Sequence, residues 1–421
     1  MIKVYKFGGA SVKDATNIIR LANQLKEDQY PHKVVVISAM GKMTNAFERL
    51  ANAYFEQNSQ DKKDAFDYIY QYHSNIISEL FNQDSLIEIE ELFEQIETKI
   101  ADSPSLNFDF EYDQIVSFGE LLSTKLISKY ISHAGLNNSW VDIRPLLRTS
   151  ENYREGVVDW QISEQNIRQK FRFKTNNVSL YITQGFIAST YTNLTTTLGR
   201  EGSDYSAAIV AKSLEADSLT IWKDVDGVLN ADPRYFTVTE KIEFLSYRDA
   251  IELAYFGASV IHPKTLKPLR DIGIPLFVKN FHHTIREGTM IGKQEKVKPL
   301  PPIYILKKDQ VLITIADRGL SFLTEEDIAF FYQALAFHQA KSNLVQQSAL
   351  YFSVVIDKND RKFSAIIEQL MQKYQVKYND GLELLTIQNS NPTRNSLDYI
   401  SHKELLIEQH NRKTSRYLVK Q

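Results

Sequence analysis

Short apolar runs that end at glycine turns and alternate with helical patterns constrain this chain more than any other feature. The run Ile2–Phe7 ends at Gly8-Gly9, and apolar residues at helical spacing follow it. The Val- and Ile-rich run Lys33–Ala39 also ends at a glycine, Gly41. Strands that alternate with helices predict a largely parallel sheet with helices on both faces. In such sheets ligands bind beyond the carboxyl ends of the strands.

The same α/β alternation continues to about residue 290, where we expect the first domain, residues 1–290, to end. From Thr44 to about Lys99 the pattern is helical with few breakers, which predicts a helical insertion over about residues 44–110. The other expected elements are helices over Tyr112–His133, Asp204–Leu214 and Tyr247–Phe256, and strands over Asn138–Ile143, Val178–Thr183, Ser218–Lys223 and Pro275–Val278.

A second unit is predicted after a polar, proline-containing linker over residues 291–302. Residues 303–388 give the order βαββαβ, which is typical of a small ferredoxin-like α+β sandwich. Its expected strands are Val311–Ala316, Leu344–Gln347, Leu350–Ile356, Gln375–Tyr378 and Leu382–Gln388, and its helices Glu325–His338 and Phe363–Tyr374. Residues 389–421 hold two short apolar runs without a helical pattern, so we expect a truncated second copy there.

Composition excludes several classes of protein. The 421 residues carry 49 Lys and Arg against 52 Asp and Glu, a net charge of -3, which does not favour a nucleic-acid partner. Without a cysteine, the chain forms no disulfide, zinc-thiolate site or thiol nucleophile. The first residues lack a charged-then-apolar leader, and the apolar runs are too short to span a membrane. We therefore expect a cytoplasmic protein without a membrane partner.

The first candidate site is the turn after the first strand. Lys6 stands at the strand end, Gly8 and Gly9 let the backbone approach an anion, and a helix N-terminus follows. This arrangement suits a phosphate group, although a Gly-Gly turn after a strand is more often plain turn chemistry. The chain has no Walker-type Gly-Lys-Ser/Thr motif, so a P-loop is not the explanation.

A second candidate site is the glycine-rich loop Thr195–Ser206, which opens a helix. It combines three threonines, two glycines and Arg200 with Ser203 and Asp204, either of which could cap the helix. Capping alone does not need an arginine or a run of hydroxyls, so this loop favours a functional role. The long polar turn after the strand Ser218–Lys223 is expected at the same edge of the sheet.

Together these residues resemble the aspartate kinases of the amino-acid kinase family, with their C-terminal ACT domains. The resemblance covers roughly residues 1–290, and its TTLGR-x-GSD and DPR blocks are highly specific. The matching motifs are Lys6–Val12, Ser38-Ala39 with Thr44-Asn45, Ser117–Glu120, Thr183–Phe186, Thr196–Asp204, Asp224–Arg234 and Phe256–Pro263.

The resemblance implies the amino-acid kinase fold followed by ACT-type modules, and transfer of the γ-phosphoryl group of MgATP to the β-carboxylate of L-aspartate. This would be the first step of the lysine, threonine and methionine pathway. A carboxylate is already ionised at neutral pH, so the nucleophile needs no general base. Catalysis then reduces to positioning two anions and neutralising charge on the transferred group.

The resemblance also implies a role for each matching residue. Lys6, Ser203 and Asp204 would be catalytic, with Asp204 orienting Lys6. Substrate aspartate would be held by Thr44, Glu120, Phe186, Arg200 and Ser203, with Arg200 on its α-carboxylate and Glu120 on its α-ammonium. ATP would contact Lys6, Gly8, Gly9, Ala10, Lys223, Asp224, Leu229, Arg234 and Ser259. The Mg²⁺ ion would be held mainly by phosphates, without a protein metal site.

Several positions depart from the family or have plainer explanations. Ala10 replaces a threonine, Leu229 stands where some members have tyrosine, and Ser259 stands where many have lysine. Glu201 occupies a common glycine position and adds an anion beside Arg200. We expect Asp226 and Asp232 to be solvated, His262-Pro263 to shape a turn, and His282-His283 to lie in a solvated linker.

The regulatory end of the chain is expected to bind lysine or threonine, in the way that ACT modules do, between the chains of a homodimer. The corresponding residues are Ser321, Gln346, Gln347 and Ser348. The alternative is a module that only mediates dimerisation. Two other functions stay open for the whole chain: another phosphotransferase of the family, such as an acetylglutamate or nucleoside monophosphate kinase, and a non-catalytic amino-acid sensor.

Overall fold

The computed structural model describes residues 1–83, 85–173, 178–258, 261–293, 299–319, 321–389 and 399–420. The chain divides into two compact units. The first comprises Met1–Val228, Lys241–Ile251 and Val260–Lys296, and the second Leu229–Glu240, Glu252–Ser259 and Val297–Gln421. Two short segments inside the predicted first domain therefore group with the C-terminal residues.

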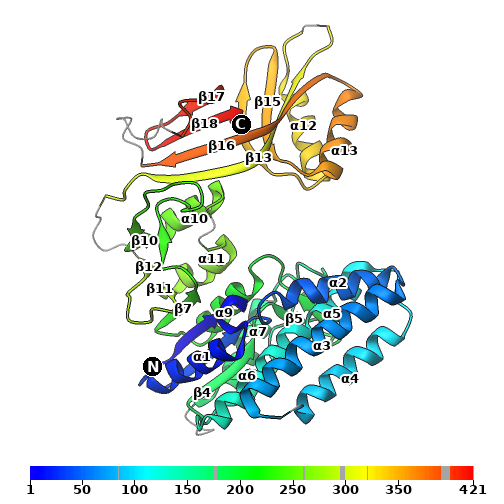
Figure 1. The fold of residues 1–421 in the computed structure, drawn as a ribbon. Helices are drawn as coiled ribbons and strands as arrows, with labels where there is room; N and C mark the ends of the chain where they lie inside the picture. The colour runs from blue at the N-terminus through cyan, green and yellow to red at the C-terminus, as the bar shows by residue number, and fades with distance from the viewer. Residues whose placement is uncertain are drawn as a thin grey trace. The chain divides into compact units, whose positions relative to one another are not determined.

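The first unit is built on an eight-stranded sheet in the order β10-β12-β11-β7-β1-β2-β4-β3 (Figure 1). All neighbouring strands are parallel except β11 and β12, which are antiparallel. The strands are β1 (Lys3–Phe7), β2 (Lys33–Ile37), β3 (Ser139–Val141), β4 (Leu180–Gln184), β7 (Ser218–Lys223), β10 (Phe244–Ser246), β11 (Leu276–Asn280) and β12 (Thr289–Gly292). The predicted parallel α/β sheet is confirmed.

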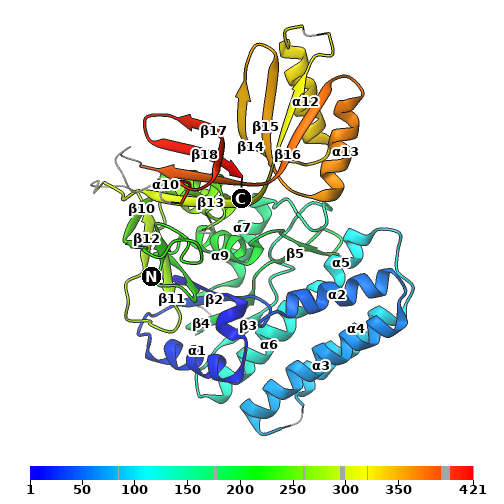
Figure 2. The ribbon, with the colours of Figure 1, turned by 45° about the horizontal axis from the view of Figure 1, so that its top comes forward.

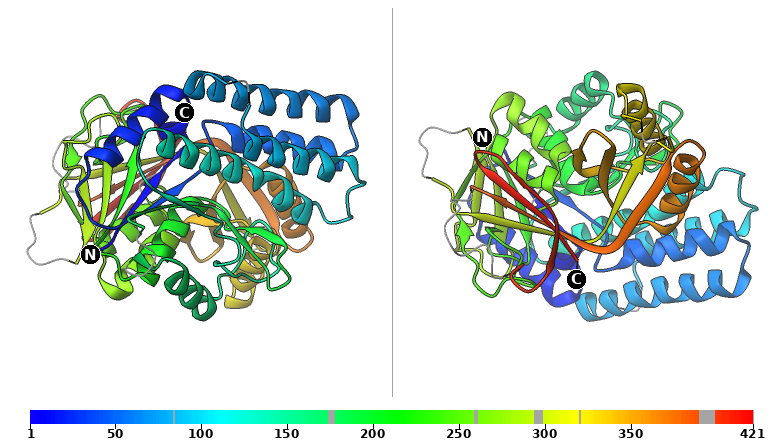
Figure 3. Two further views of the ribbon diagram at one scale, coloured as in Figure 1. Left: turned by 90° about the horizontal axis from the view of Figure 1, so that it is seen from below. Right: turned by 90° about the horizontal axis from the view of Figure 1, so that it is seen from above.

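Helices cover both faces of this sheet, as predicted (Figure 3). One face packs against α6 (Phe118–His133), which also contacts α1 (Ala15–Glu27). The other packs against α9 (Gly202–Ser213), with α7 (Trp160–Lys170) and α11 (Pro263–Ile272) beside it. The interior strands of the sheet are buried on both faces, which explains why β2 consists of a basic residue followed by Val and Ile only.

Smaller elements complete the first unit. Two of them are two-stranded ribbons, which the sequence did not predict. The elements are η1 (Gly9–Val12), α10 (Tyr247–Phe256), and the ribbons β5 (Ile187–Ser189) with β6 (Thr195–Thr197) and β8 (Val228–Leu229) with β9 (Lys241–Ile242). The last residues of α10 and of β8 belong to segments that group with the second unit.

A layer of helices interrupts the alternation between β2 and β3. Its members are α2 (Met43–Phe55), α3 (Ser59–Phe81), α4 (Ile87–Ala101) and α5 (Phe108–Val116). The side chain of Asn58 caps α3, and that of Asn107 caps α5. The single helix predicted over Tyr112–His133 is wrong, because the chain turns at Ser117 and starts α6 afresh. That break places Glu120 in the first turn of α6.

The second unit contains a six-stranded antiparallel sheet in the order β14-β15-β13-β16-β18-β17 (Figure 2). The elements are β13 (Ile303–Ala316), α12 (Glu325–Phe337), β14 (Ser342–Gln347), β15 (Tyr351–Asp357), α13 (Asp360–Met371), β16 (Gln375–Gln388), β17 (Glu404–His410) and β18 (Thr414–Lys420). The predicted βαββαβ order is confirmed, but the two strands expected over 375–388 are one continuous strand.

Alternate residues of β13 separate two apolar cores in this unit. Val311, Ile313 and Ile315 pack with α12 and α13, whereas Leu312 packs on the other face with residues of β16 and β18. The first core includes Phe331, which is 0% exposed. Among the described residues after Met371 no helix is present. The assignment of residues 389–421 as a truncated second module stays a prediction.

None of the helices in the described ranges is both long enough and apolar enough to cross a membrane.

Substitution of Phe331 tests the core of the second unit. Phe331→Ala should lower the free energy of unfolding by about 3–5 kcal/mol, because it removes a buried ring and leaves a cavity. Phe337→Ala on the same helix is the matched control: that ring is 79% exposed, so its loss should change the free energy by no more than about 0.5 kcal/mol. Urea unfolding followed by circular dichroism gives both values, and equal losses would contradict this packing.

Candidate active site

The carboxyl ends of four parallel strands meet at one edge of the first unit's sheet. In the strand register Phe7 pairs with both Ile37 and Trp222, and Ile37 pairs with Gln184. Backbone hydrogen bonds link the turns that come after these strands. For example, Gly41 N donates to Gly9 O at 3.0 Å. The segments that leave this edge begin with residues 8–9, 38–41, 185–186 and, after β7, Asp224.

Lys6, Asp204 and Lys223 form the charged centre of this edge. Lys6 Nζ lies 2.7 Å from Asp204 Oδ1, and Lys223 Nζ lies 3.8 Å from Asp204 Oδ2. Burial alone would raise the pKa of Asp204, but the two ammonium groups outweigh it and hold that pKa below its ordinary value. Two cations around one carboxylate leave a net positive charge, which suits an anionic ligand.

The glycine turn lies directly beside this centre. A Cβ on Gly8 would lie 3.4 Å from Lys6 Nζ, so the ammonium group is next to this backbone. A Cβ on Gly9 would lie 2.7 Å from Gly41 O and 2.8 Å from Ala39 O, closer than real Cβ atoms come to backbone oxygens. Glycine is therefore required at position 9, and Ala10 follows it, exposed, in η1.

Glu120 brings a second carboxyl to the same edge of the sheet. Its Oε1 accepts a hydrogen bond from Ala39 N at 3.2 Å, while Oε2 is buried without a hydrogen-bond partner among the described residues. Burial raises the pKa of Glu120 to about 8, although the Ala39 N–H and the Lys6 ammonium both lower it. A buried carboxyl with one free oxygen is ready to ionise when a cation arrives.

The loop before α9 packs tightly on the turn after β4. A Cβ on Gly185 would lie 2.6 Å from Ser203 Cβ, so Ser203 rests directly on this glycine. Phe186 has a φ of 69°, donates its N–H to Ser206 Oγ at 3.0 Å and accepts from Leu198 N at 2.9 Å. Ser203 and Phe186 thus lie close together.

Two neighbours in that loop have different surroundings. Arg200 is exposed, and none of the described residues forms an ion pair with it. Glu201 has a φ of 54°, which explains why a glycine is common at this position. Its carboxylate accepts a hydrogen bond from His262 N at 2.8 Å and so holds the start of α11. His262 caps α11 by accepting from Lys264 N, in agreement with its predicted turn-shaping role.

The remaining predicted residues are spread more widely. Thr44 lies in the first turn of α2, and Asp224 is exposed after β7. Leu229 and Arg234 belong to the second unit, where Arg234 Nη2 lies 2.6 Å from Asp232 Oδ2. Ser259 lies outside the described residues.

Three residues expected to be solvated also have side-chain partners. Asp226 accepts a hydrogen bond from Asn280 Nδ2 at 2.7 Å and pairs with Arg286. Asp232 pairs with Arg234, as above. His282 and His283 are both exposed, in keeping with the solvated segment expected there, and His282 Nδ1 also contacts the Arg20 guanidinium.

The residues predicted to bind an effector gather at one end of the second unit's sheet. Ala316 at the end of β13 pairs with Tyr351, and Gln347 at the end of β14 pairs with Phe352. Ser321 follows the first of these ends: its N–H donates to Asp317 Oδ2 at 3.1 Å. Gln346 and Gln347 end β14, and Ser348 N donates to Tyr351 O.

Sequence reasoning missed Asp113, a fully buried carboxylate on α5. Burial raises its pKa to about 6, although hydrogen bonds from Arg154 and Thr197 lower it. One signal was available: Asp113 lies between the apolar residues Tyr112 and Ile115, which are both buried. A charged residue among core positions needs a partner, but the sequence does not identify that partner.

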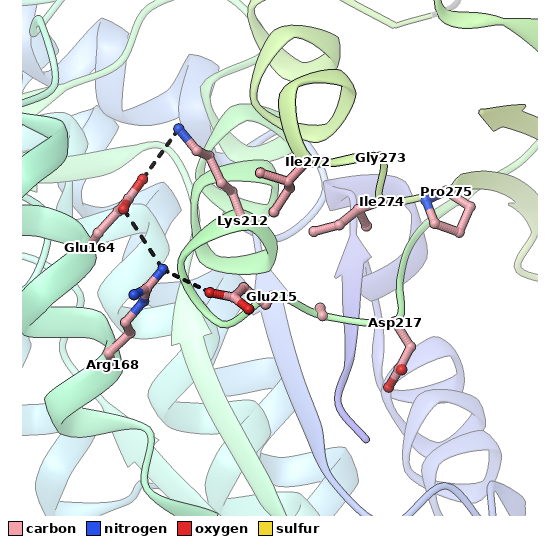
Figure 4. A pocket seen from close by; sticks show the side chains of 10 residues that line it. Glu164, Arg168, Lys212, Glu215, Asp217, Ile272, Gly273, Ile274 and Pro275 are labelled. Atoms are coloured by element: carbon pink, nitrogen blue, oxygen red, sulfur yellow. Dashed lines mark hydrogen bonds and ion pairs between the residues drawn. The ribbon is translucent and has the colours of Figure 1, made fainter. Parts of the chain in front are cut away.

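A separate cavity of about 450 Å³ lies at the amino ends of β7 and β11 (Figure 4). Its charged side chains pair with one another: Lys212 Nζ lies 3.2 Å from Glu164 Oε1, and Arg168 Nη2 lies 3.2 Å from Glu215 Oε1. Asp217 accepts hydrogen bonds from Ile2 N and the Tyr30 hydroxyl. Because its charges are already paired, this cavity is a weaker candidate than the opposite edge of the sheet.

Known proteins share both the sequence and the fold. The model of the amino acid kinase family matches residues 1–280. Lysine-sensitive aspartokinase 3 of Escherichia coli is 31% identical over 401 residues, which cover 92% of this chain and 86% of that protein. The chain spans only 32% of the bifunctional aspartokinase/homoserine dehydrogenase of Daucus carota, to which it is 34% identical over 306 residues.

Two crystal structures of E. coli aspartokinase III resemble this structure over its full length. The complex with aspartate and ADP, described as the R-state, has a TM-score of 0.85 and 27% identity. The complex with lysine and aspartate, described as the T-state, has a TM-score of 0.82 and 27% identity. Both comparisons cover 100% of this chain and 96% of the other.

The burial of Glu120 predicts a pH-dependent stability. Its pKa of about 8 in the folded protein lies above the ordinary value of 4.5, so the folded state binds this proton more tightly. This proton therefore stabilises the folded protein fully below the pKa of Glu120 in the unfolded chain. The stabilisation is lost as the pH rises through about 8, the pKa in the folded protein. Relative to Glu120→Gln, the wild type should lose at most about 1.4 kcal/mol per pH unit across this window. Urea midpoints of both proteins at pH 5 to 9 measure it, and parallel profiles would contradict it.

Proposed function

The chain belongs to the amino acid kinase family, and we propose that it is an aspartate kinase, which transfers the γ-phosphoryl group of ATP to the side-chain carboxylate of L-aspartate. The observation that carries this proposal is the cluster of Lys6, Asp204 and Lys223 beside the Gly8-Gly9 turn, with the unpaired oxygen of Glu120 nearby. The likeness to an aspartokinase in complex with aspartate and ADP supports it.

The net positive charge of Lys6, Lys223 and Asp204 suits the phosphate groups of a nucleotide. Lys6 with the amides of Gly8 and Gly9 would hold the β- and γ-phosphate oxygens, because a lysine and exposed N–H groups both favour negative charge. Asp204 would keep Lys6 in place, as its 2.7 Å ion pair indicates. The further nucleotide contacts that we propose are Ala10, Lys223, Asp224, Leu229, Arg234 and Ser259.

A bound Mg²⁺ ion fits this arrangement as a partner of the phosphates. No group of three His, Cys, Asp or Glu residues in the described ranges could hold a metal by itself. Mg²⁺ commonly keeps several waters and binds phosphate oxygens, so it needs few protein ligands. The ion would neutralise phosphate charge, while Lys6 and Lys223 add fixed positive charge next to it.

The substrate amino acid would lie between Glu120 and the loop before α9, which carries Arg200. Arg200, exposed and without an ion-pair partner among the described residues, is available for the α-carboxylate, which its planar fork can bind through two hydrogen bonds. The free oxygen of Glu120 would accept a hydrogen bond from the α-ammonium group, whose positive charge would lower the pKa of Glu120 again. Thr44 and Ser203 would hydrogen-bond the reacting carboxylate, and Phe186 would line the site.

The two alternative functions would each give a different assay result from an aspartate kinase. Another phosphotransferase of the family would phosphorylate a different acceptor, and an amino-acid sensor would bind without turnover. The ion pairs of Lys6 and Lys223 with Asp204 argue against a sensor, because binding without turnover does not need two ammonium groups around one buried carboxylate.

Trapping the acyl phosphate tests this proposal. With ATP, Mg²⁺ and hydroxylamine, the protein should form a hydroxamate from L-aspartate and from no other acidic amino acid. Lys6→Ala should lower kcat by about 100- to 1,000-fold, since it removes charge stabilisation of the transferred group. Lys26→Ala, at the end of α1, is the control and should keep full activity. Product with another acceptor only, or with none, would refute the aspartate kinase assignment.

Regulation by lysine is the second part of the proposal. The likeness to the lysine complex of aspartokinase III supports it, and so does the gathering of Ser321, Gln346 and Gln347 at one end of the second unit's sheet. Assembly as a homodimer through the C-terminal modules and a place at the start of lysine and threonine synthesis follow from the same proposal.

Calorimetry on the full chain tests this regulation. Injection of L-lysine should give a saturable heat signal, and Gln346→Ala should weaken the binding at least about tenfold, which corresponds to about 1.4 kcal/mol. L-threonine serves as the competing candidate, and D-lysine as the matched control ligand. A heat signal for neither L-amino acid would leave the second unit with a purely structural role.

A further inference from the structure

Within the part of the chain that the structure describes, the ribbon strand β6 has a strand neighbour on one edge only, and side chains of α5 bond to the other edge. Gln114 Nε2 donates to Thr195 O at 2.8 Å, and Thr195 N donates to Gln114 Oε1 at 3.2 Å. Thr197 N donates to Asp113 Oδ2 at 2.9 Å. Side chains of the helical insertion thus supply hydrogen bonds that a further strand would otherwise make.

Asp113 makes the largest contribution to this contact. Besides the Thr197 N–H, its carboxylate accepts from Thr197 Oγ1 at 2.7 Å and from Arg154 N at 2.8 Å. The side chain is 0% exposed, so these hydrogen bonds are shielded from solvent. Loss of Asp113 therefore leaves up to three donors without their acceptor, which is costly in a buried place.

These bonds converge on the loop that carries Arg200. Thr197 precedes Arg200 by three residues, and Gly156 N donates to Thr197 O at 2.8 Å. Asp113 also holds the backbone at Arg154, and this backbone packs against Gly199: a Cβ on Gly199 would lie 3.1 Å from Arg154 O. Asp113 fixes both β6 and residues 154–156, and the loop from Gly199 to Arg200 lies against them.

We infer that Asp113 is a positioning residue for the amino-acid substrate: its buried carboxylate holds β6 and residues 154–156 so that Arg200 is aimed at the substrate's α-carboxylate. The inference rests on the proposed function, which gives Arg200 this partner. It also assigns a task to the helical insertion, since α5 supplies the carboxylate from outside the sheet. Asp113 itself contacts neither Lys6 nor the Gly8-Gly9 turn through any hydrogen bond or ion pair among the described residues.

Substitutions on α5 separate this role from general stability. Asp113→Ala should raise the KM for aspartate at least tenfold and change the KM for ATP less than twofold. Asp113→Asn keeps the shape: its oxygen can accept from the two N–H groups and its NH₂ can donate to Thr197 Oγ1, so it should restore the aspartate KM to within about threefold. Asp109→Ala is the matched control, because Asp109 is exposed on the same helix and, among the described residues, forms an ion pair with the Arg154 guanidinium alone, at 3.2 Å. Assays at pH 8 keep Asp113 ionised.

The inference is wrong if Asp113→Ala leaves the aspartate KM unchanged, if both KM values rise together, or if Asp113→Asn is as impaired as Asp113→Ala. Should Asp113→Ala fail to fold, Thr197→Val decides: it removes one hydrogen bond to Asp113 and should raise the aspartate KM severalfold, and no rise refutes the inference. A wild type that forms no acyl phosphate would refute the proposed function separately. In that case the aspartate Kd of the same variants, from calorimetry, still tests Asp113.

Discussion

The ion pair between Lys6 and Asp204 is the interaction on which the rest of this site depends. Both side chains are nearly buried, and burying charges is costly unless they are paired. Asp204 stands in the first turn of α9, where the helix dipole also favours a carboxylate. Lys223 approaches the same carboxylate, so one anion orders two cations. The pair is therefore better explained as a way to fix positive charge than as a source of stability.

The parallel sheet explains why distant residues meet there. Strands β1, β2, β4 and β7 end level with one another, and each is followed by a turn that contributes to the site. Close packing of these turns requires glycine where a side chain would meet backbone, as at Gly9. The helical layer acts from outside the sheet: the break at Ser117 starts α6 so that Glu120 meets Ala39 N, and α5 presents Asp113 to β6.

The apolar spacing of the sequence predicted those helices and strands whose bounds depend on neighbouring residues. The strand Ser218–Lys223 and the helix Tyr247–Phe256 have the bounds expected from their apolar spacing. The start of β13 was missed because Lys307, Lys308 and Asp309 interrupt the apolar pattern, although polar residues are tolerated on a half-exposed strand. The sequence motifs predicted Lys6, Asp204 and Glu120 as site residues, and these side chains lie at the same edge of the sheet. The partners of Glu201 and Asp113 lie 61 and 84 residues away, and such contacts follow from packing rather than from any local signal.

A double-mutant cycle on kcat tests most directly whether Lys6 and Asp204 act as one unit. Lys6→Met, Asp204→Asn and the double variant would be compared with the wild type in single-turnover phosphoryl transfer to aspartate. If Asp204 acts by holding Lys6, the double variant should be no slower than the slower single variant. If the two losses multiply instead, the residues act independently, and this account of the site is wrong.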